Sequence, residues 1–104
     1  MAKVIYIAGP ITGVPEYRKA FEAAEIELSA KGFVPLAPSH LPSGMTNARY
    51  MRVCFAMIDS ADAVLFLPGW EKSAGAKLER QYCVYTGKPY ARSIATLEAT
   101  RGVF

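Results

Sequence analysis

The sequence predicts an α/β fold in which an open parallel sheet of about four strands has helices on both faces. Three observations lead to this prediction. Short apolar runs alternate along the chain with segments of helical periodicity. Two of the runs, at residues 3–8 and 62–67, are apolar after a charged first residue, which is typical of strands buried on both faces. A third run contains Pro35, which suits an edge strand because proline donates no backbone hydrogen bond.

The first two elements are predicted to be a strand and a helix. The strand, KVIYIA at 3–8, ends at Gly9, and the glycines and prolines that follow indicate a loop. Pro15 suits the first turn of a helix, and Glu16 favours the positive end of its dipole. Apolar residues then recur at helical spacing until Gly32, which we expect to cap the helix at its C-terminus.

A second strand and a second helix follow. The strand is FVPL at 33–36, and the polar, proline-bearing segment 37–46 is predicted to be a loop. Thr46 can cap the helix, in which Tyr50 and Cys54 belong to an apolar stripe at helical spacing.

The last third of the chain repeats the pattern after the buried strand at 62–67. Ser73 can cap a helix over 74–86, which Gly87 ends. A short strand is predicted at 88–91. The tail 92–104 is ambiguous, although IATLEATR could form a short helix.

The order of elements predicts the order of strands. The most apolar strands, the first and the third, belong in the middle of the sheet, and the strand with Pro35 belongs at an edge. This gives a small flavodoxin-like (Rossmann-like) three-layer fold with strand order 2-1-3-4, joined by right-handed crossovers. Ligands of such sheets bind beyond the carboxyl ends of the strands where the order reverses. Here the loops 9–14 and 68–75 meet at that point.

Length and composition limit the function classes. We expect residues 1–104 to form a single domain. The net charge of +3 comes without a basic run, which argues against nucleic-acid binding. No apolar stretch reaches the roughly 18 residues of a membrane span, so no membrane partner is expected. Without an export signal we expect a cytoplasmic protein in which Cys54 and Cys83 are reduced thiols. The single histidine, His40, lacks neighbouring ligands, and neither a metal nor another cofactor is predicted.

Several groups that could bind a ligand follow the third strand, in LPGWEKSAGAKLE at 67–79. Ser73 and Gly75 begin a helix whose free amides could hold a polar group. Trp70 offers a flat surface for a planar base, and Glu79 leans back toward the helix start. Tyr6, at the end of the first strand, could supply a hydroxyl.

The first loop is the other half of the predicted site, with Gly9, Pro10, Ile11 and Gly13 expected to contact the substrate. The glycines would allow close backbone approach. Each candidate also has a purely structural interpretation. Glu79 could be a solvated helix residue, Trp70 a core residue and Ser73 only a cap, while Gly75 could let the helix pack closely. The functional interpretation is favoured because these groups converge where the topology predicts a ligand.

Two longer motifs resemble those of the nucleoside 2-deoxyribosyltransferase superfamily. They are YIAGPITG at 6–13 and ADAVLFLPGWEKSAGAKLE at 61–79, with YMR at 50–52 as a third similarity. The resemblance covers about residues 4–91 and is nearest to a small bacterial and phage branch of uncharacterised members.

The resemblance implies N-glycosidic chemistry on deoxynucleosides or their monophosphates, by base transfer or by hydrolysis. Glu79 matches the family's nucleophile, which attacks C1′ of the sugar to form a covalent glycosyl-enzyme. Tyr6 matches a tyrosine that orients the nucleophile, and Ser73 and Gly75 are in register with the binding motif. The resemblance also implies a homo-oligomer.

This sequence departs from the family pattern at two places. Cys54 stands where active relatives carry an aspartate that contacts the sugar or base. Pro10 and Thr12 stand where relatives that hydrolyse monophosphates carry serine and arginine, which argues against a monophosphate substrate.

The sequence is also compatible with other functions. The main alternative is a nucleoside- or nucleotide-binding protein without turnover. A phosphoribohydrolase with the motif P-G-G-x-G-T-x-x-E is disfavoured, because Trp70 replaces its second glycine and the turn is longer. An interaction module and a flavin-binding protein are also compatible with the fold, but the fold alone does not assign a function.

Overall fold

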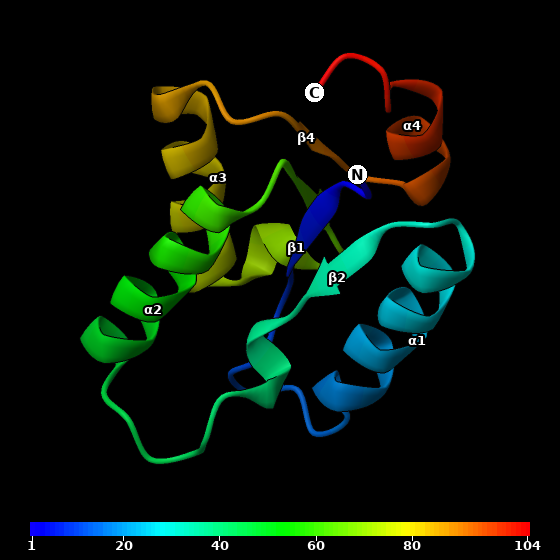
Figure 1. Cartoon of the computed structure of the whole chain (residues 1–104). Helices are drawn as coiled ribbons and strands as arrows, with labels where there is room; N and C mark the ends of the chain where they lie inside the picture. The colour runs from blue at the N-terminus through cyan, green and yellow to red at the C-terminus, as the bar shows by residue number, and fades with distance from the viewer.

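The computed structural model describes all 104 residues and contains one parallel sheet between two layers of helices (Figure 1). The strand order is β2-β1-β3-β4, which confirms the predicted order 2-1-3-4. Every neighbouring pair of strands is parallel. The strands are somewhat shorter than the predicted runs: β1 (Val4–Ala8), β2 (Val34–Leu36), β3 (Ala63–Phe66) and β4 (Tyr90–Ala91).

Three α-helices lie close to their predicted positions, and the ambiguous tail contains a fourth. Their bounds are α1 (Tyr17–Ala30), α2 (Asn47–Ser60), α3 (Ala74–Thr86) and α4 (Ile94–Ala99), with short 3-10 helices η1 (Pro38–His40) and η2 (Trp70–Lys72). The first helix begins at Tyr17, so Pro15 and Glu16 precede its first turn and do not form it as predicted. The predicted caps form: the hydroxyl of Thr46 accepts a hydrogen bond from the amide of Arg49, and that of Ser73 from the amide of Ala76, each at 3.2 Å.

Alternation along the central strands divides the core into two parts, because successive side chains of a strand point to opposite faces. Ile5 and Ile7 pack in one cluster with residues of α1 and α4. Tyr6 and Ala8 pack in the other cluster with residues of α2 and α3. Figure 1 shows these two helix pairs on opposite sides of the sheet. The side chain of Tyr6 therefore lies on the same side of the sheet as α2 and α3.

The edge position of β2 agrees with its proline. Pro35 pairs with Ile5 of β1, and no strand lies beyond β2. Because all four strands run in the same direction, the segments that follow them leave the sheet at one edge. None of the helices has the length and apolarity that a membrane span requires.

Candidate active site

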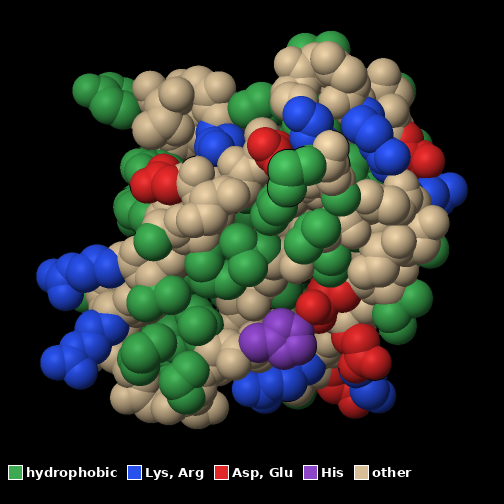
Figure 2. Space-filling model, viewed as in Figure 1, with side chains coloured by type: hydrophobic (Ala, Val, Ile, Leu, Met, Phe, Trp, Pro, Cys, Tyr) green, Lys and Arg blue, Asp and Glu red, His purple; other side chains and the backbone are tan.

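A cavity of about 720 Å³ opens at the carboxyl edge of the sheet, on the side covered by α2 and α3. Its walls come from Tyr6 in the middle of β1, the β1–α1 loop, the β2–α2 connection, the inner face of α2 and the start of α3. Figure 2 shows hydrophobic side chains gathered over this region of the surface. The volume is within the range of protein pockets that hold small-molecule ligands.

Glu79 is the central polar residue of this cavity. It lies in the second turn of α3, and its side chain leans back toward the helix start and into the cavity wall. Only 5 % of the residue is exposed. The hydroxyl of Tyr6, itself fully buried on β1, donates a hydrogen bond to Oε2 of Glu79. The structure thus brings together the two residues predicted to be catalytic.

The surroundings of Glu79 change the acidity of both groups. Burial raises the pKa of Glu79 to about 7, and the hydrogen bond from Tyr6 opposes that rise. Burial, together with the neighbouring charge of Glu79, raises the pKa of the Tyr6 phenol. Near neutral pH, Glu79 can therefore be ionised while Tyr6 keeps the proton that it donates.

Cys54 reaches the same cavity from α2 and is 7 % exposed. Burial is the main cause that raises the pKa of its thiol, and Glu79 adds to the rise. The residue therefore presents a neutral thiol where the resemblance implies an aspartate. Tyr50, one turn earlier on α2, donates to the carbonyl of Pro42 at 2.6 Å and accepts from the amide of Met45 at 3.3 Å. These bonds hold the β2–α2 loop against the helix.

The start of α3 lines the cavity through Ser73 and Gly75. Ser73 uses its hydroxyl to cap the helix, and the next amides belong to cavity-lining residues. A Cβ atom at Gly75 would lie 3.6 Å from the sulfur of Met51 on α2. This is an ordinary contact distance, so packing against α2 does not by itself require glycine at this position.

The structure does not bring Trp70 to the cavity. Its ring is 8 % exposed and packs on Phe66, with 5.3 Å between the ring centroids. The guanidinium groups of Arg80 and Arg92 lie 5.9 and 5.3 Å from its centroid. These contacts hold the ring beside β3 and β4. The ring is not part of the cavity wall, so it offers no surface on which a base in the cavity could stack.

The first loop contributes less than predicted. Ile11 lines the cavity together with Thr12, whereas Gly9, Pro10 and Gly13 do not. The backbone at Gly9 lies close to another part of the protein, because a Cβ atom at Gly9 would lie 3.1 Å from Cβ of Leu67. Pro10 borders a second, smaller cavity of about 280 Å³ beside α1.

Sequence reasoning missed the wall formed by the β2–α2 connection and the first turns of α2. Its members are cavity-lining residues between Pro38 and Met51: Pro38, Leu41, Pro42, Ser43, Asn47, Tyr50 and Met51. Two signals were available. A segment that follows a parallel strand leaves at the same edge as the other loops. In addition, Asn47, Tyr50 and Cys54 share one helix face by their spacing.

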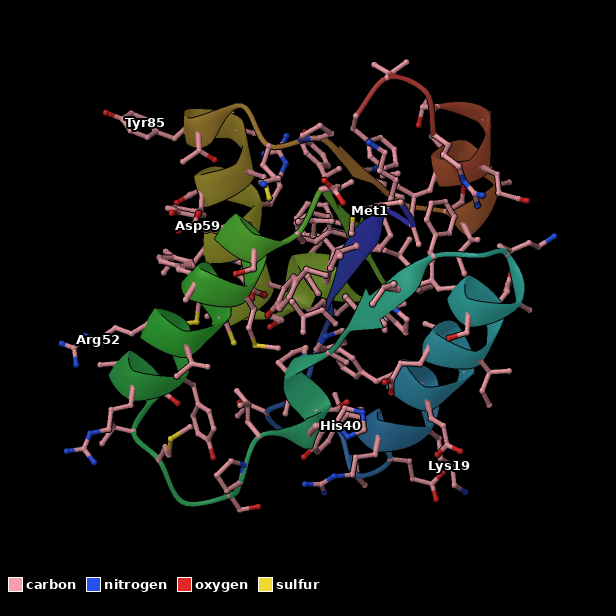
Figure 3. All side chains as sticks on the ribbon, in the orientation of Figure 1. Met1, Lys19, His40, Arg52, Asp59 and Tyr85 are labelled. Carbon is pink, nitrogen blue, oxygen red and sulfur yellow. The ribbon has the colours of Figure 1, made fainter.

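His40 lies outside this arrangement. Its ring pairs with the carboxylate of Glu25 at 2.8 Å, and its side chain is 71 % exposed. Figure 3 shows it at η1, near α1. No group of three or more His, Cys, Asp or Glu side chains is placed to hold a metal ion.

Comparison with known proteins gives a family and two related structures. The model of the family DUF4406, described as a domain of unknown function, matches residues 3–91. No curated protein matches the sequence. A 2-desoxiribosyltransferase from Leishmania mexicana has a TM-score of 0.67 and 26 % identity, over 85 % of this chain and 61 % of that one. A 2-deoxyribosyltransferase from Bacillus psychrosaccharolyticus has a TM-score of 0.64 and 20 % identity, over 84 % of this chain and 69 % of that one. The chain thus spans about three-fifths of the length of the Leishmania protein.

Proposed function

The chain belongs to the DUF4406 family, and we propose that it acts on the N-glycosidic bond of nucleosides with Glu79 as the nucleophile. The observation that carries the proposal is the buried carboxylate of Glu79, which accepts a hydrogen bond from Tyr6 in the wall of a cavity that is large enough for a nucleoside. The similarity to two 2-deoxyribosyltransferases supports the same class of reaction.

In the proposed reaction, Oε1 of Glu79 attacks C1′ of the sugar while the bond from C1′ to the base breaks. Tyr6 holds Oε2 and so orients the carboxylate for attack. The resulting glycosyl ester is then cleaved by a second base, which gives transfer, or by water, which gives hydrolysis. Ile11, Ser73, Gly75 and Cys54 would contact the sugar or base, because they line the same cavity.

The direct test uses a panel of deoxynucleosides and monophosphates, with and without a second base, and chromatography of the released base. Glu79→Gln is the matched variant, since it keeps the shape of the side chain and removes its charge. We expect it to fold and to lose at least about a hundredfold to a thousandfold in rate, roughly 3–4 kcal/mol of transition-state stabilisation. A covalent adduct on the intact wild-type chain, detected by mass spectrometry, would identify the intermediate. An unchanged rate in Glu79→Gln would refute the assignment.

A second candidate function is nucleoside binding without turnover. It is favoured by one observation: Glu79 is the only carboxylate among the residues that line the cavity, and Cys54 presents a thiol instead of a second acid. Under this alternative, a nucleoside would raise the melting temperature of the protein while no base is released from any member of the panel.

A further inference from the structure

We propose that the preferred substrate is an N-glycoside whose base carries a positive charge, such as a pyridinium or an N-alkylated purinium nucleoside. This inference rests on the function proposed above and narrows its substrate class. Two independent features of the cavity support it: Glu79 has no positively charged partner in the protein, and the cavity holds no second carboxyl group.

The first feature is the missing counter-charge of Glu79. The three ion pairs of the protein join Lys19 to Glu16, Lys31 to Glu98 and His40 to Glu25, and none involves Glu79. Its single hydrogen-bond donor is the neutral hydroxyl of Tyr6. A buried carboxylate without an opposite charge is unfavourable, because burial removes the water that would solvate it. A positively charged ring in the cavity would supply the missing charge, and a neutral base would not.

The second feature concerns the proton that a neutral base needs when it leaves. In glycoside cleavage a carboxylic acid commonly supplies it. The residues that line this cavity include no aspartate, no histidine and no glutamate besides Glu79. Two of the three phenols have their protons engaged, Tyr6 with Glu79 and Tyr50 with the carbonyl of Pro42. The phenol of Tyr17 and the thiol of Cys54 remain, and both group types are much weaker acids than a carboxyl group.

A positively charged base removes the need for that proton. Oε1 of Glu79 forms a bond to C1′, and the electron pair of the C1′–N bond passes to the ring nitrogen. The base then departs as a neutral molecule, and the charge of the carboxylate is consumed in the ester. Water, or a second base, attacks C1′ and restores the carboxylate; with water, one proton is released to solvent. The steps balance without an acid, an oxidant or a reductant.

The remaining walls of the cavity are compatible with an organic cation. Tyr17 and Tyr50 contribute aromatic rings, whose faces attract cations. The ring of Tyr17 already has the guanidinium of Arg18 at 4.8 Å from its centroid. The only cation among the lining residues is Lys72, which is exposed on η2, so that solvent screens its charge.

The test compares pairs of substrates in which the base is positively charged in one member and neutral in the other. One pair is the nucleoside of nicotinamide and its reduced 1,4-dihydropyridine form, each with ribose and with 2-deoxyribose. The other pair is 7-methyl-2′-deoxyguanosine and 2′-deoxyguanosine. Released base is measured with the wild-type protein, and Glu79→Gln provides the background of spontaneous cleavage. We expect kcat/KM to be about 10²–10⁴-fold higher for the charged member of each pair, the contribution of a general acid that the neutral member lacks here.

Replacing the thiol with an acid provides a second test. Cys54→Asp should lower the ratio of the charged to the neutral rate at least tenfold, whereas Cys54→Ser, which adds no acid, should preserve the ratio. Melting curves show whether each variant is folded. If Cys54→Asp does not fold, the ratio of the charged to the neutral rate in the wild-type protein decides whether a charged base is preferred.

The outcomes separate this inference from the function on which it rests. Cleavage of neutral nucleosides at rates equal to or above those of the charged ones would overturn the inference and leave the proposed function standing. Absence of Glu79-dependent release from every nucleoside would remove the proposed function, and the inference with it.

Discussion

Enclosure of the Glu79 carboxyl group has a consequence for stability that can be measured apart from activity. Burial raises its pKa from 4.5 to about 7, so the folded state binds the proton more tightly than the unfolded state does. The groups that act on it or respond to it are Tyr6, Cys54 and Cys83. Between the two pKa values the folded protein carries more protons, and the free energy of unfolding therefore decreases as pH rises.

We therefore expect Glu79 to contribute a loss of about 3 kcal/mol of stability between pH 4.5 and pH 7, with no further change on either side. Glu79→Gln has no titratable group at this position. The difference in unfolding free energy between variant and wild type should consequently grow with pH across this window, as urea titrations at a series of pH values would measure. A difference that is constant with pH would contradict the raised pKa.

Gly9 offers a second test at the residue scale, because a side chain at this position would contact Leu67 of the protein itself. A Cβ atom would lie 3.1 Å from Cβ of Leu67, so Gly9→Ala should force the ends of β1 and β3 apart. We expect a loss of about 1–3 kcal/mol in unfolding free energy. Gly102→Ala is the matched control, since nothing lies within 4 Å of its Cβ position, and it should change stability by less than about 0.5 kcal/mol. Equal effects of the two substitutions would show that the contact with Leu67 is relieved without cost.

At the element scale, the N-termini of α3 and α4 provide a matched pair. Ser73 and Ser93 each accept a hydrogen bond of 3.2 Å from the amide three residues later, but only Ser73 lines the cavity. Ser73→Ala and Ser93→Ala should each cost about 1 kcal/mol of stability through loss of the cap. Only Ser73→Ala should also weaken nucleoside binding, as calorimetric titration would measure. Equal affinities in the two variants would limit Ser73 to a capping role.

At the scale of the whole molecule, the outer surfaces of α2 and α3 leave apolar side chains without partners. Val53, Val84 and Tyr85 are 36, 57 and 92 % exposed. Figure 3 shows Tyr85 pointing away from the molecule. Together with the family resemblance, this surface predicts a homo-oligomer of at least two chains, because exposed apolar groups of this kind favour burial in an interface.

Sedimentation velocity at micromolar concentration measures the oligomeric state. We expect the wild-type protein to sediment as a dimer or a larger species, and Tyr85→Lys to shift it toward the monomer. Ile26→Lys is the control, because Ile26 is 64 % exposed on α1, which covers the opposite side of the sheet. A wild-type protein that sediments only as a monomer would contradict the prediction.

The sequence by itself determined the order of elements, the arrangement of the sheet and the positions of the helix caps. These features depend on local patterns: apolar runs for β1 and β3, a proline for the edge strand β2, and serine or threonine before α2 and α3. The placement of Glu79 near Tyr6 could also be predicted from the sequence. The lean of a helical side chain and the alternation along a strand bring the two residues together on the same face of the sheet.

Only the tertiary structure decided what surrounds that pair. Trp70 lies in a short 3-10 helix, where no periodicity specifies the direction of its ring, and packing on Phe66 turned it away from the cavity. The wall between Pro38 and Met51 likewise depends on how α2 packs over the sheet. The absence of a cation beside Glu79 is a property of the assembled protein as well. Contacts between segments that are distant in the chain depend on how those segments pack against one another. Local sequence patterns therefore do not predict these contacts.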